Sequence, residues 1–335
     1  MGIAGAVATA TTVAALLLAL VSESRGSEGD RQPAYRACVT RCPTSGCATV
    51  DTNSKAVCPS VCSSNEPSAA IAALWSCQDD CRYRCMWAIE DSRKEAQKRT
   101  YAAYKYHGKW PFLRVLGMQE LLSVLASLGN LAAHISGFSK LQRSVNNTHG
   151  KYPLYLWRLY FFSSCFAWVA SAVFHSRDTH LTESLDYGAA NVTIATGLWA
   201  SITRCAGSQT GRWAGMGILI GLCFHIGHMH LVKFDYGRNM AVCIAAGVLQ
   251  SCMWTSWVWM KKHPGRWTLT AFMVAVNTAM LLEVLDFPPL ASLLDAHGAW
   301  HFATVPLVSM WYTFLQADVQ WSEGFANPPA ARKYS

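Results

Sequence analysis

Residues 153–175 read PLYLWRLYFFSSCFAWVASAVFH, an apolar run that contains a single charged side chain, Arg158. A helix needs about 20 mainly apolar residues to cross a bilayer, so this run predicts a membrane-spanning helix. Comparable runs lie on both sides of it, at 112–138, 186–204, 214–232, 239–260, 267–284 and 300–317. The sequence therefore predicts an all-α membrane protein with a bundle of seven transmembrane helices.

The composition agrees with a chain that sits in lipid. Hydrophobic residues make up 52% of its 335 residues and charged residues only 14%, whereas soluble proteins carry about 25% charged residues. The net charge is +8, but the Lys and Arg residues lie between apolar runs and form no nucleic-acid motif. We expect membrane lipid as a partner and no nucleic acid.

The first residues of the chain resemble a signal peptide, with an apolar stretch from Val7 to Val21. No Lys or Arg precedes that stretch, so an uncleaved anchor stays open as an alternative. In either case the following segment is expected in the lumen. The expected division is a signal peptide at 1–24, a Cys-rich lumenal domain with a juxtamembrane segment at 25–110, the helix bundle at 111–318 and a cytosolic tail at 319–335.

Cysteines crowd into the segment that follows the signal peptide. An even number in a short translocated segment predicts disulfides, although the sequence does not fix the pairing. The alternative is a zinc site, because Cys77, Cys81 and Cys85 repeat at helical spacing. The remaining cysteines, scattered among the apolar runs, are expected as buried thiols that act as small hydrophobic residues. The crowded cysteines are Cys38, Cys42, Cys47, Cys58, Cys62, Cys77, Cys81 and Cys85, and the scattered ones are Cys165, Cys205, Cys223, Cys243 and Cys252.

The charges in the loops indicate the orientation of the bundle. If the Cys-rich domain is lumenal, most Lys and Arg of the short loops fall on the cytosolic side, as the positive-inside rule requires. The basic stretch 93–114 would then be lumenal, against the same rule. The glycosylation sequon that begins at Asn146 falls on the cytosolic side and is expected to stay unmodified.

Ionisable residues at membrane depth are costly, so each is a functional candidate. In this topology His175 ends the second run, Asp186 begins the third, and His297 and His301 enter the last, all at the lumenal face. His297 and His301 are spaced so that both project from one face of a helix. Together with His175 they predict a three-histidine zinc site with a fourth position open, as in catalytic zinc centres.

Two further residues suit a hydrolytic reaction at such a site. A zinc ion there activates water and polarises an ester carbonyl. Asp186 could hold or deprotonate that water, and Ser171, one turn before His175, could donate to an oxyanion. The plainer interpretation is that His297 and His301 form a solvated pair at the membrane interface.

Other polar residues near the lumenal face have no single interpretation. A second histidine cluster near the end of the fourth run could bind metal, but an interfacial role is favoured because its side chains share no clean face. Glu283 and Asp286 could bind a headgroup, cap a loop, or orient a zinc-bound histidine from behind. Glu120 has no assigned role. The second cluster consists of His225, His228 and His230.

At these residues the sequence resembles the post-GPI-attachment-to-proteins factor family. The resemblance rests on several motifs in order, and it covers nearly the whole chain after the signal peptide. Arg238 departs from the aromatic residue expected in that family, outside the predicted metal site. The motifs are YHGKWP at 106–111, SAVFH at 171–175 followed by Asp178, Glu183 and Asp186-Tyr187, FDYG at 234–237, LDFPP at 285–289 and HGAWH at 297–301.

This resemblance implies a fold, a site and an activity. The family belongs to a wider group of seven-helix hydrolases that includes alkaline ceramidases, in which a Ser, an Asp and three His form the zinc site. The matching positions are Ser171, Asp186, His175, His297 and His301. The implied activity is that of a GPI-specific phospholipase A2, which removes the sn-2 acyl chain of GPI-anchored proteins in the endoplasmic reticulum or Golgi membrane.

Two other functions stay open at this stage. One is a ceramidase-like hydrolase of the same chemistry, although a large lumenal domain suits a protein-linked substrate better. The other is a non-enzymatic receptor or cargo adaptor in which zinc holds the bundle together. Structural zinc usually has a closed set of protein ligands, whereas three histidines leave one position open.

Overall fold

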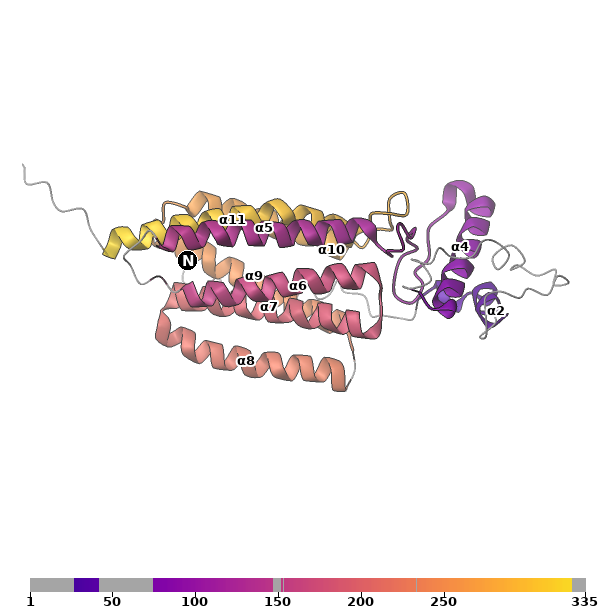
Figure 1. The fold of residues 1–335 in the computed structure, drawn as a ribbon, viewed down its shortest axis with the longest axis horizontal. Coiled ribbons are helices and arrows are strands. Elements are labelled where there is room, and N and C mark those ends of the chain that lie inside the picture. The colour runs from indigo at the N-terminus through magenta and orange to yellow at the C-terminus, as the bar shows by residue number, and fades with distance from the viewer. Residues whose placement is uncertain (1–26, 42–74, 147–151, 153, 233, 327–335) are drawn as a thin grey trace, which may run out of the picture.

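The computed structural model describes residues 27–41, 75–146, 152, 154–232 and 234–326. This part of the chain is all-α, and its extended pairings are three isolated bridges. Figure 1 shows a bundle of long helices with two smaller ones beyond one end. The smaller helices are α2 (Pro33–Arg41) and α4 (Cys77–Gln97), and the long ones are α5 (Leu121–Asn146), α6 (Leu154–Ser176), α7 (His180–Ala206), α8 (Ser208–Leu231), α9 (Tyr236–Met260), α10 (Arg266–Leu285) and α11 (Ala296–Ala326).

Five of the long helices, α5, α6, α8, α9 and α10, are long and apolar enough to cross a membrane by length and composition. On α8 the large apolar side chains of Trp213, Ile220 and Phe224 are exposed. A helix can expose such side chains to lipid because its backbone polar groups are bonded internally. These five helices are consistent with a multi-pass membrane protein.

Each predicted apolar run overlaps one of the helices α5 to α11. Several boundaries differ: α7 and α8 each begin six residues earlier than predicted, and the largest differences are at the first start and the last end. The first run was expected to be helical from residue 112, whereas α5 begins at Leu121. Before it, Val115 and Met118 close a tight turn in which Leu116 and Gly117 have positive φ angles. Such angles interrupt a helix. At the other end, α11 continues to Ala326, beyond the predicted end at 317.

Helices α5 and α11 form the closest pair in the bundle. A Cβ atom at Gly137 of α5 would lie 2.3 Å from the ring of Tyr312 on α11. A Cβ at Gly298, in the first turn of α11, would lie 2.9 Å from the hydroxyl of Ser123 on α5. Glycine at both places lets the two backbones approach closely, which brings the polar residues of α5 beside those of α11.

The far end of the bundle is closed by a buried carboxylate. Asp318 of α11 is fully buried and accepts two hydrogen bonds from Arg204 of α7, at 2.8 and 2.7 Å. Tyr152 donates a third at 2.8 Å, and His263 Nε2 lies 3.4 Å away. A buried charge needs such partners. This cluster ties together helices that are distant in the sequence.

The smaller helices form a head whose core is linked by a disulfide. Cys38 of α2 is bonded to Cys85 of α4, and Cys81 is also in a disulfide. The alternative of a zinc site at Cys77, Cys81 and Cys85 is therefore wrong. The buried carboxylate of Glu90 accepts hydrogen bonds from the hydroxyls of Tyr101 and Tyr106, at 2.6 and 2.7 Å. Cys42, Cys47, Cys58 and Cys62 lie outside the described residues.

The scattered cysteines are free thiols, as expected. Cys223 is exposed on α8, and the other four are partly buried. The expectation that they are buried is therefore wrong for Cys223 and met only in part for the other four.

The head lies against one end of the bundle (Figure 1). Arg114, between the head and α5, pairs with Asp80 of α4 at 3.3 Å, and its guanidinium lies 3.5 Å from the ring centre of Trp75. The indole of Trp75 donates to the carbonyl of Gly117. The end of the bundle beside the head is the one where α6 finishes and α11 begins.

Candidate metal centre

Three histidines meet at the end of the bundle that carries the head. His175 lies in the last turn of α6, and His297 and His301 lie in the first two turns of α11. One ring nitrogen from each lies within 4.8 Å of the others. His175 and His301 are buried, and His297 is partly buried. The sequence-based grouping of these three residues is thus reproduced in space.

Each of the three rings is held through its Nδ1 atom. His175 Nδ1 lies 2.6 Å from Glu120 Oε2, and His297 Nδ1 lies 2.6 Å from Glu283 Oε2. His301 Nδ1 lies 3.4 Å from the hydroxyl of Ser127. A carboxylate or hydroxyl behind Nδ1 places the proton there and leaves the Nε2 lone pair for a metal ion.

The Nε2 atoms are the ring nitrogens that these contacts leave for a ligand. Those of His297 and His301 are 2.8 Å apart, and the buried Nε2 of His175 has no hydrogen-bond partner among the described residues. A buried polar atom without a partner is costly unless another group occupies its lone pair. Three convergent nitrogens and one orphaned lone pair fit a metal ion held by three histidines with a further position open.

The two supporting carboxylates are themselves held in place. Lys109 Nζ donates to Glu120 Oε1 at 2.8 Å and lies 3.3 Å from Asp178 Oδ2. Burial by itself would lower the pKa of Lys109, but the carboxylates of Glu120 and Asp178 outweigh it and raise that pKa. The hydroxyl of Tyr236 donates to Glu283 Oε1 at 2.7 Å. His175 is thus held by Glu120, which is held by Lys109. In the same way His297 is held by Glu283, which is held by Tyr236.

Backbone contacts position Glu120 beside the end of α6. Its amide donates to the carbonyl of His175 at 3.0 Å, and the amide of Gln119 donates to the carbonyl of Ser176 at 3.0 Å. The last carbonyls of a helix have no partner within the helix. Their capping by residues 119 and 120 fixes the start of α5 against the histidine.

Ser171 lies one turn before His175, as predicted, and its nearest polar neighbour is Ser127. The two hydroxyl oxygens are 3.1 Å apart, and Ser127 also donates to the carbonyl of Ser123 at 2.8 Å. With that donation made, Ser127 accepts from both Ser171 and His301 Nδ1. Ser171 is therefore connected to the centre through Ser127 in this arrangement.

Asp186 lies in the second turn of α7, partly buried. Its carboxylate interacts electrostatically with His175 and His297. No hydrogen bond joins it to another described residue. The predicted aspartate is thus within electrostatic range of two of the histidines, and its oxygen atoms make no hydrogen bond with a described residue.

The second histidine cluster does not converge. His225 Nε2 lies 3.1 Å from Asn239 Oδ1, and His228 Nε2 lies 3.1 Å from the guanidinium of Arg238. His230 is exposed.

Asp286 does not contact a histidine: it pairs with Lys105 and accepts a hydrogen bond from the indole of Trp110. Of the roles considered for Glu283, the orientation of a histidine is the one its contacts support.

Several site residues were missed by the sequence analysis. Glu120 was noticed without a role, although an acidic residue at membrane depth signals a partner nearby. Lys109 and Tyr236 both lie within motifs that had been singled out, YHGKWP and FDYG. Ser127 carries no signal of its own, because small hydroxyl residues are common on apolar helices.

The fold and the site together define a multi-helix membrane protein with a three-histidine centre at one end of its bundle. Residues 67–319 match the Per1-like family, and the chain belongs to that family. No solved structure matches this chain.

Named relatives align with almost the whole chain. It is 35% identical over 308 residues to a protein of Bos taurus named GPI-specific phospholipase A2-like PGAP3, covering 90% of this chain and 92% of the relative. It is 33% identical over 315 residues to the Homo sapiens protein of the same name, covering 90% and 92%. It is 33% identical over 315 residues to the Drosophila melanogaster protein named post-GPI attachment to proteins factor 3, covering 91% and 93%.

Glu283→Gln tests whether the carboxylate behind His297 serves a metal ion. The amide accepts a weaker hydrogen bond from Nδ1–H, so metal affinity should fall about 10- to 100-fold, as for other residues behind metal-bound histidines. Competition with a chelator on the purified full-length chain measures this change. Asp286→Asn, three residues further on and without a histidine contact, should keep the wild-type affinity; equal affinities for all three proteins would contradict the assignment.

Proposed function

We propose that this chain is a zinc-dependent hydrolase that removes the sn-2 acyl chain from GPI-anchored proteins. The observation that carries the proposal is the convergence of three Nε2 atoms whose rings are each held at Nδ1. The names of the relatives, which describe a GPI-specific phospholipase A2-like protein, supply the substrate class. On this proposal His175, His297 and His301 bind zinc, while Asp186 and Ser171 are catalytic.

The side chains around the centre suit each step of ester hydrolysis. Zinc bound there would lower the pKa of a water molecule and polarise the ester carbonyl. Glu120 and Glu283 keep the protons of His175 and His297 on Nδ1 and fix the orientation of both rings. Asp186 accepts the proton of the attacking water as the oxygen adds to the carbonyl carbon, and it returns that proton to the glycerol oxygen when the ester C–O bond breaks and the fatty acid is released. For the hydroxyl of Ser171 to donate to the oxygen that gains negative charge, it must turn away from Ser127, to which it donates in this structure.

The location of the centre suits a substrate that lies in a membrane. The histidines lie at one end of a bundle whose outer surfaces are apolar, so an acyl ester near the lipid headgroups would lie at about their depth. The head lies beyond the same end (Figure 1), where the glycan and the attached protein of a GPI anchor would project. A free ceramide has no glycan or attached protein that would reach such a domain.

The proposed topology has all of α5 to α11 crossing the membrane of the endoplasmic reticulum or Golgi, with the head and the histidines lumenal. Helices α7 and α11 are included because they pack among the five helices that are long and apolar enough to cross a membrane. A signal peptide at 1–24, a lumenal part at 25–110, the bundle at 111–318 and a cytosolic tail complete this arrangement. GPI anchors occupy the lumenal leaflet, so this orientation gives the centre access to them.

Lipid analysis of GPI anchors in cells lacking this protein tests the proposed reaction. Wild-type protein should restore loss of the sn-2 acyl chain, and a variant with His297→Ala and His301→Ala should restore none, because two of three ligands are gone. The matched control is a variant with His225→Ala and His230→Ala, which removes two histidines from α8 and should restore remodelling.

All variants must be compared at equal expression. Full remodelling by the variant lacking His297 and His301 would exclude the proposed centre. Direct cleavage of free ceramide by the purified wild-type protein, without cleavage of GPI lipids, would instead favour the ceramidase-like alternative.

An engineered glycosylation site tests the orientation. Glu95→Asn together with Gln97→Thr creates an acceptor sequon at the exposed end of α4. Glycosylation occurs only in the lumen, so this variant should gain a glycan that a glycosidase removes, seen as a mobility shift. The native sequon at Asn146, on the opposite side of the membrane in this topology, should stay unmodified. A glycan at Asn146 and none on α4 would reverse the orientation.

A further inference from the structure

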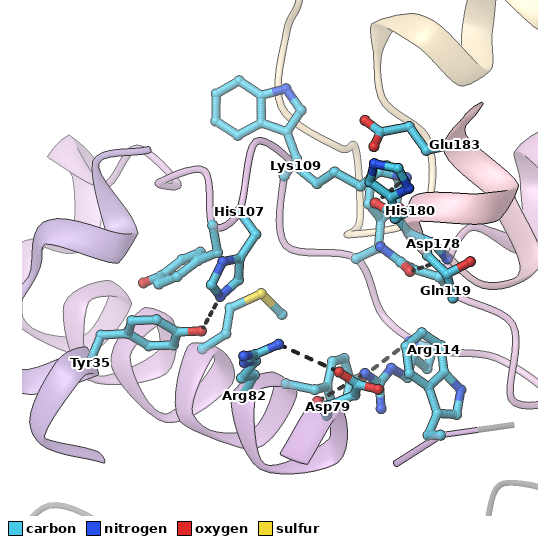
Figure 2. Close-up of a pocket in the computed structure, with 17 residues that line it drawn as sticks. Tyr35, Asp79, Arg82, His107, Lys109, Arg114, Gln119, Asp178, His180 and Glu183 are labelled. Carbon is cyan, nitrogen blue, oxygen red and sulfur yellow. Dashed lines mark hydrogen bonds and ion pairs between the residues drawn. The ribbon is translucent and has the colours of Figure 1, made fainter. Parts of the chain in front are cut away.

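A cavity of about 370 Å³ lies between the head and the end of the bundle. Residues of α2 and α4 form one wall, the first turn of α7 forms another, and the segment that leads into α5 lies between them. In Figure 2, Tyr35, Arg82 and His107 lie on one side of this space, while Asp178, His180 and Glu183 lie on the other. A cavity of this size admits a small polar molecule or one or two sugar rings.

The cavity is distinct from the histidine centre but shares a residue chain with it. Lys109 lines the cavity and donates to Glu120 Oε1, while Glu120 Oε2 bonds to His175. Gln119, also in the lining, precedes Glu120 directly. A ligand in the cavity is therefore separated from the predicted reaction centre by one carboxylate and one lysine.

Aromatic rings and planar polar groups line the cavity together. Tyr35, Tyr83 and Trp110 offer rings, and Gln119 offers an amide. Rings suit the C–H faces of sugars, and amide, carboxylate and imidazole groups suit their hydroxyls because each offers donors or acceptors in one plane. This mixture is typical of sites for neutral or amine-bearing carbohydrates.

The charges of the lining favour such a ligand over a phosphate. Arg114 pairs with Asp80 and donates to the carbonyl of Asp79, and Arg82 lies 3.6 Å from the carboxylate of Asp79. Lys109 is held between Glu120 and Asp178. The three cations of the lining are therefore already paired with acidic residues, and an added anion would have to displace these partners.

One acidic side chain of the lining has no such partner. The carboxylate of Glu183, partly buried in the first turn of α7, makes no hydrogen bond or ion pair with any residue that the structure describes. His180, one turn before it, is exposed at the same edge and also makes none. A carboxylate in this position accepts hydrogen bonds from a sugar hydroxyl and attracts an amine.

We propose that this cavity binds the carbohydrate part of the substrate's headgroup, with Glu183 and His180 as its polar contacts. The inference rests on the proposed function for the identity of the substrate, a lipid whose headgroup is a glycan. Binding there would hold the lipid next to the centre, because Lys109 and Glu120 connect the two places. The head, which supplies one wall, then acts as part of the substrate site.

A binding measurement without hydrolysis tests this proposal. The probe is the soluble disaccharide glucosaminyl-inositol, which has neither phosphate nor acyl chain, titrated into the purified full-length protein in detergent. Wild type should bind it saturably, and Glu183→Gln and His180→Ala should each weaken binding about tenfold, the loss that about 1.4 kcal/mol represents. Glu95→Gln, the same change at an exposed position on α4, should bind like wild type.

The His301→Ala variant and a phosphate probe separate the remaining interpretations. His301→Ala should bind the disaccharide with wild-type affinity. If it does, and cells that carry the variant without His297 and His301 still remodel GPI anchors, the proposed function fails but the assignment of the cavity stands. The assignment itself is overturned if wild type does not bind the disaccharide, if Glu183→Gln and His180→Ala both bind normally, or if His301→Ala abolishes binding. Tighter binding of inositol phosphate than of the disaccharide would also overturn it, since it would assign the cavity to an anion.

Discussion

The hydrogen bond between Glu120 and His175 is the contact on which the arrangement of the site depends. Its two atoms are 2.6 Å apart, and both residues are almost fully buried. A buried carboxylate is stable only with charged or hydrogen-bonding partners, and here they come from His175 and Lys109. One carboxylate thereby fixes the start of α5, the end of α6 and the segment that leads from the head.

Each end of the bundle contains a buried carboxylate that is held by polar partners, but the two arrangements differ in what they leave free. At the far end, the partners of Asp318 are a guanidinium, a phenol and an imidazole, and Arg204 fills both carboxylate oxygens. The carboxylate there is bonded by groups from several segments, which stabilises the helix ends. At the near end, Glu120 and Glu283 leave the Nε2 atoms of their histidines directed away from them. One end therefore closes the bundle, while the other presents donor atoms to a ligand.

The sequence predicted the parts of this arrangement that carry their own chemical signal. His297 and His301 stood out because their spacing places both on one helix face, and His175 and Asp186 because ionisable groups are costly within apolar runs. Ser127 could not be found in this way, since its role depends on how closely α5 approaches α11. That approach rests on glycines such as Gly137 and Gly298, whose neighbours are known only from the fold. The start of α5 was missed for a related reason: the turn at Leu116 and Gly117 interrupts a run that is apolar throughout.

X-ray absorption at the zinc edge of the purified full-length protein tests the central claim most directly, because it reports the atoms around the metal without any assay of lipid cleavage. Three histidine ligands and one position for water predict a first shell of nitrogen and oxygen only, at about 2.0–2.1 Å. The imidazole rings should add their outer-shell scattering. A first shell with sulfur at about 2.3 Å would place the zinc on cysteines, and a protein that retains no zinc would contradict a zinc-dependent centre at His175, His297 and His301.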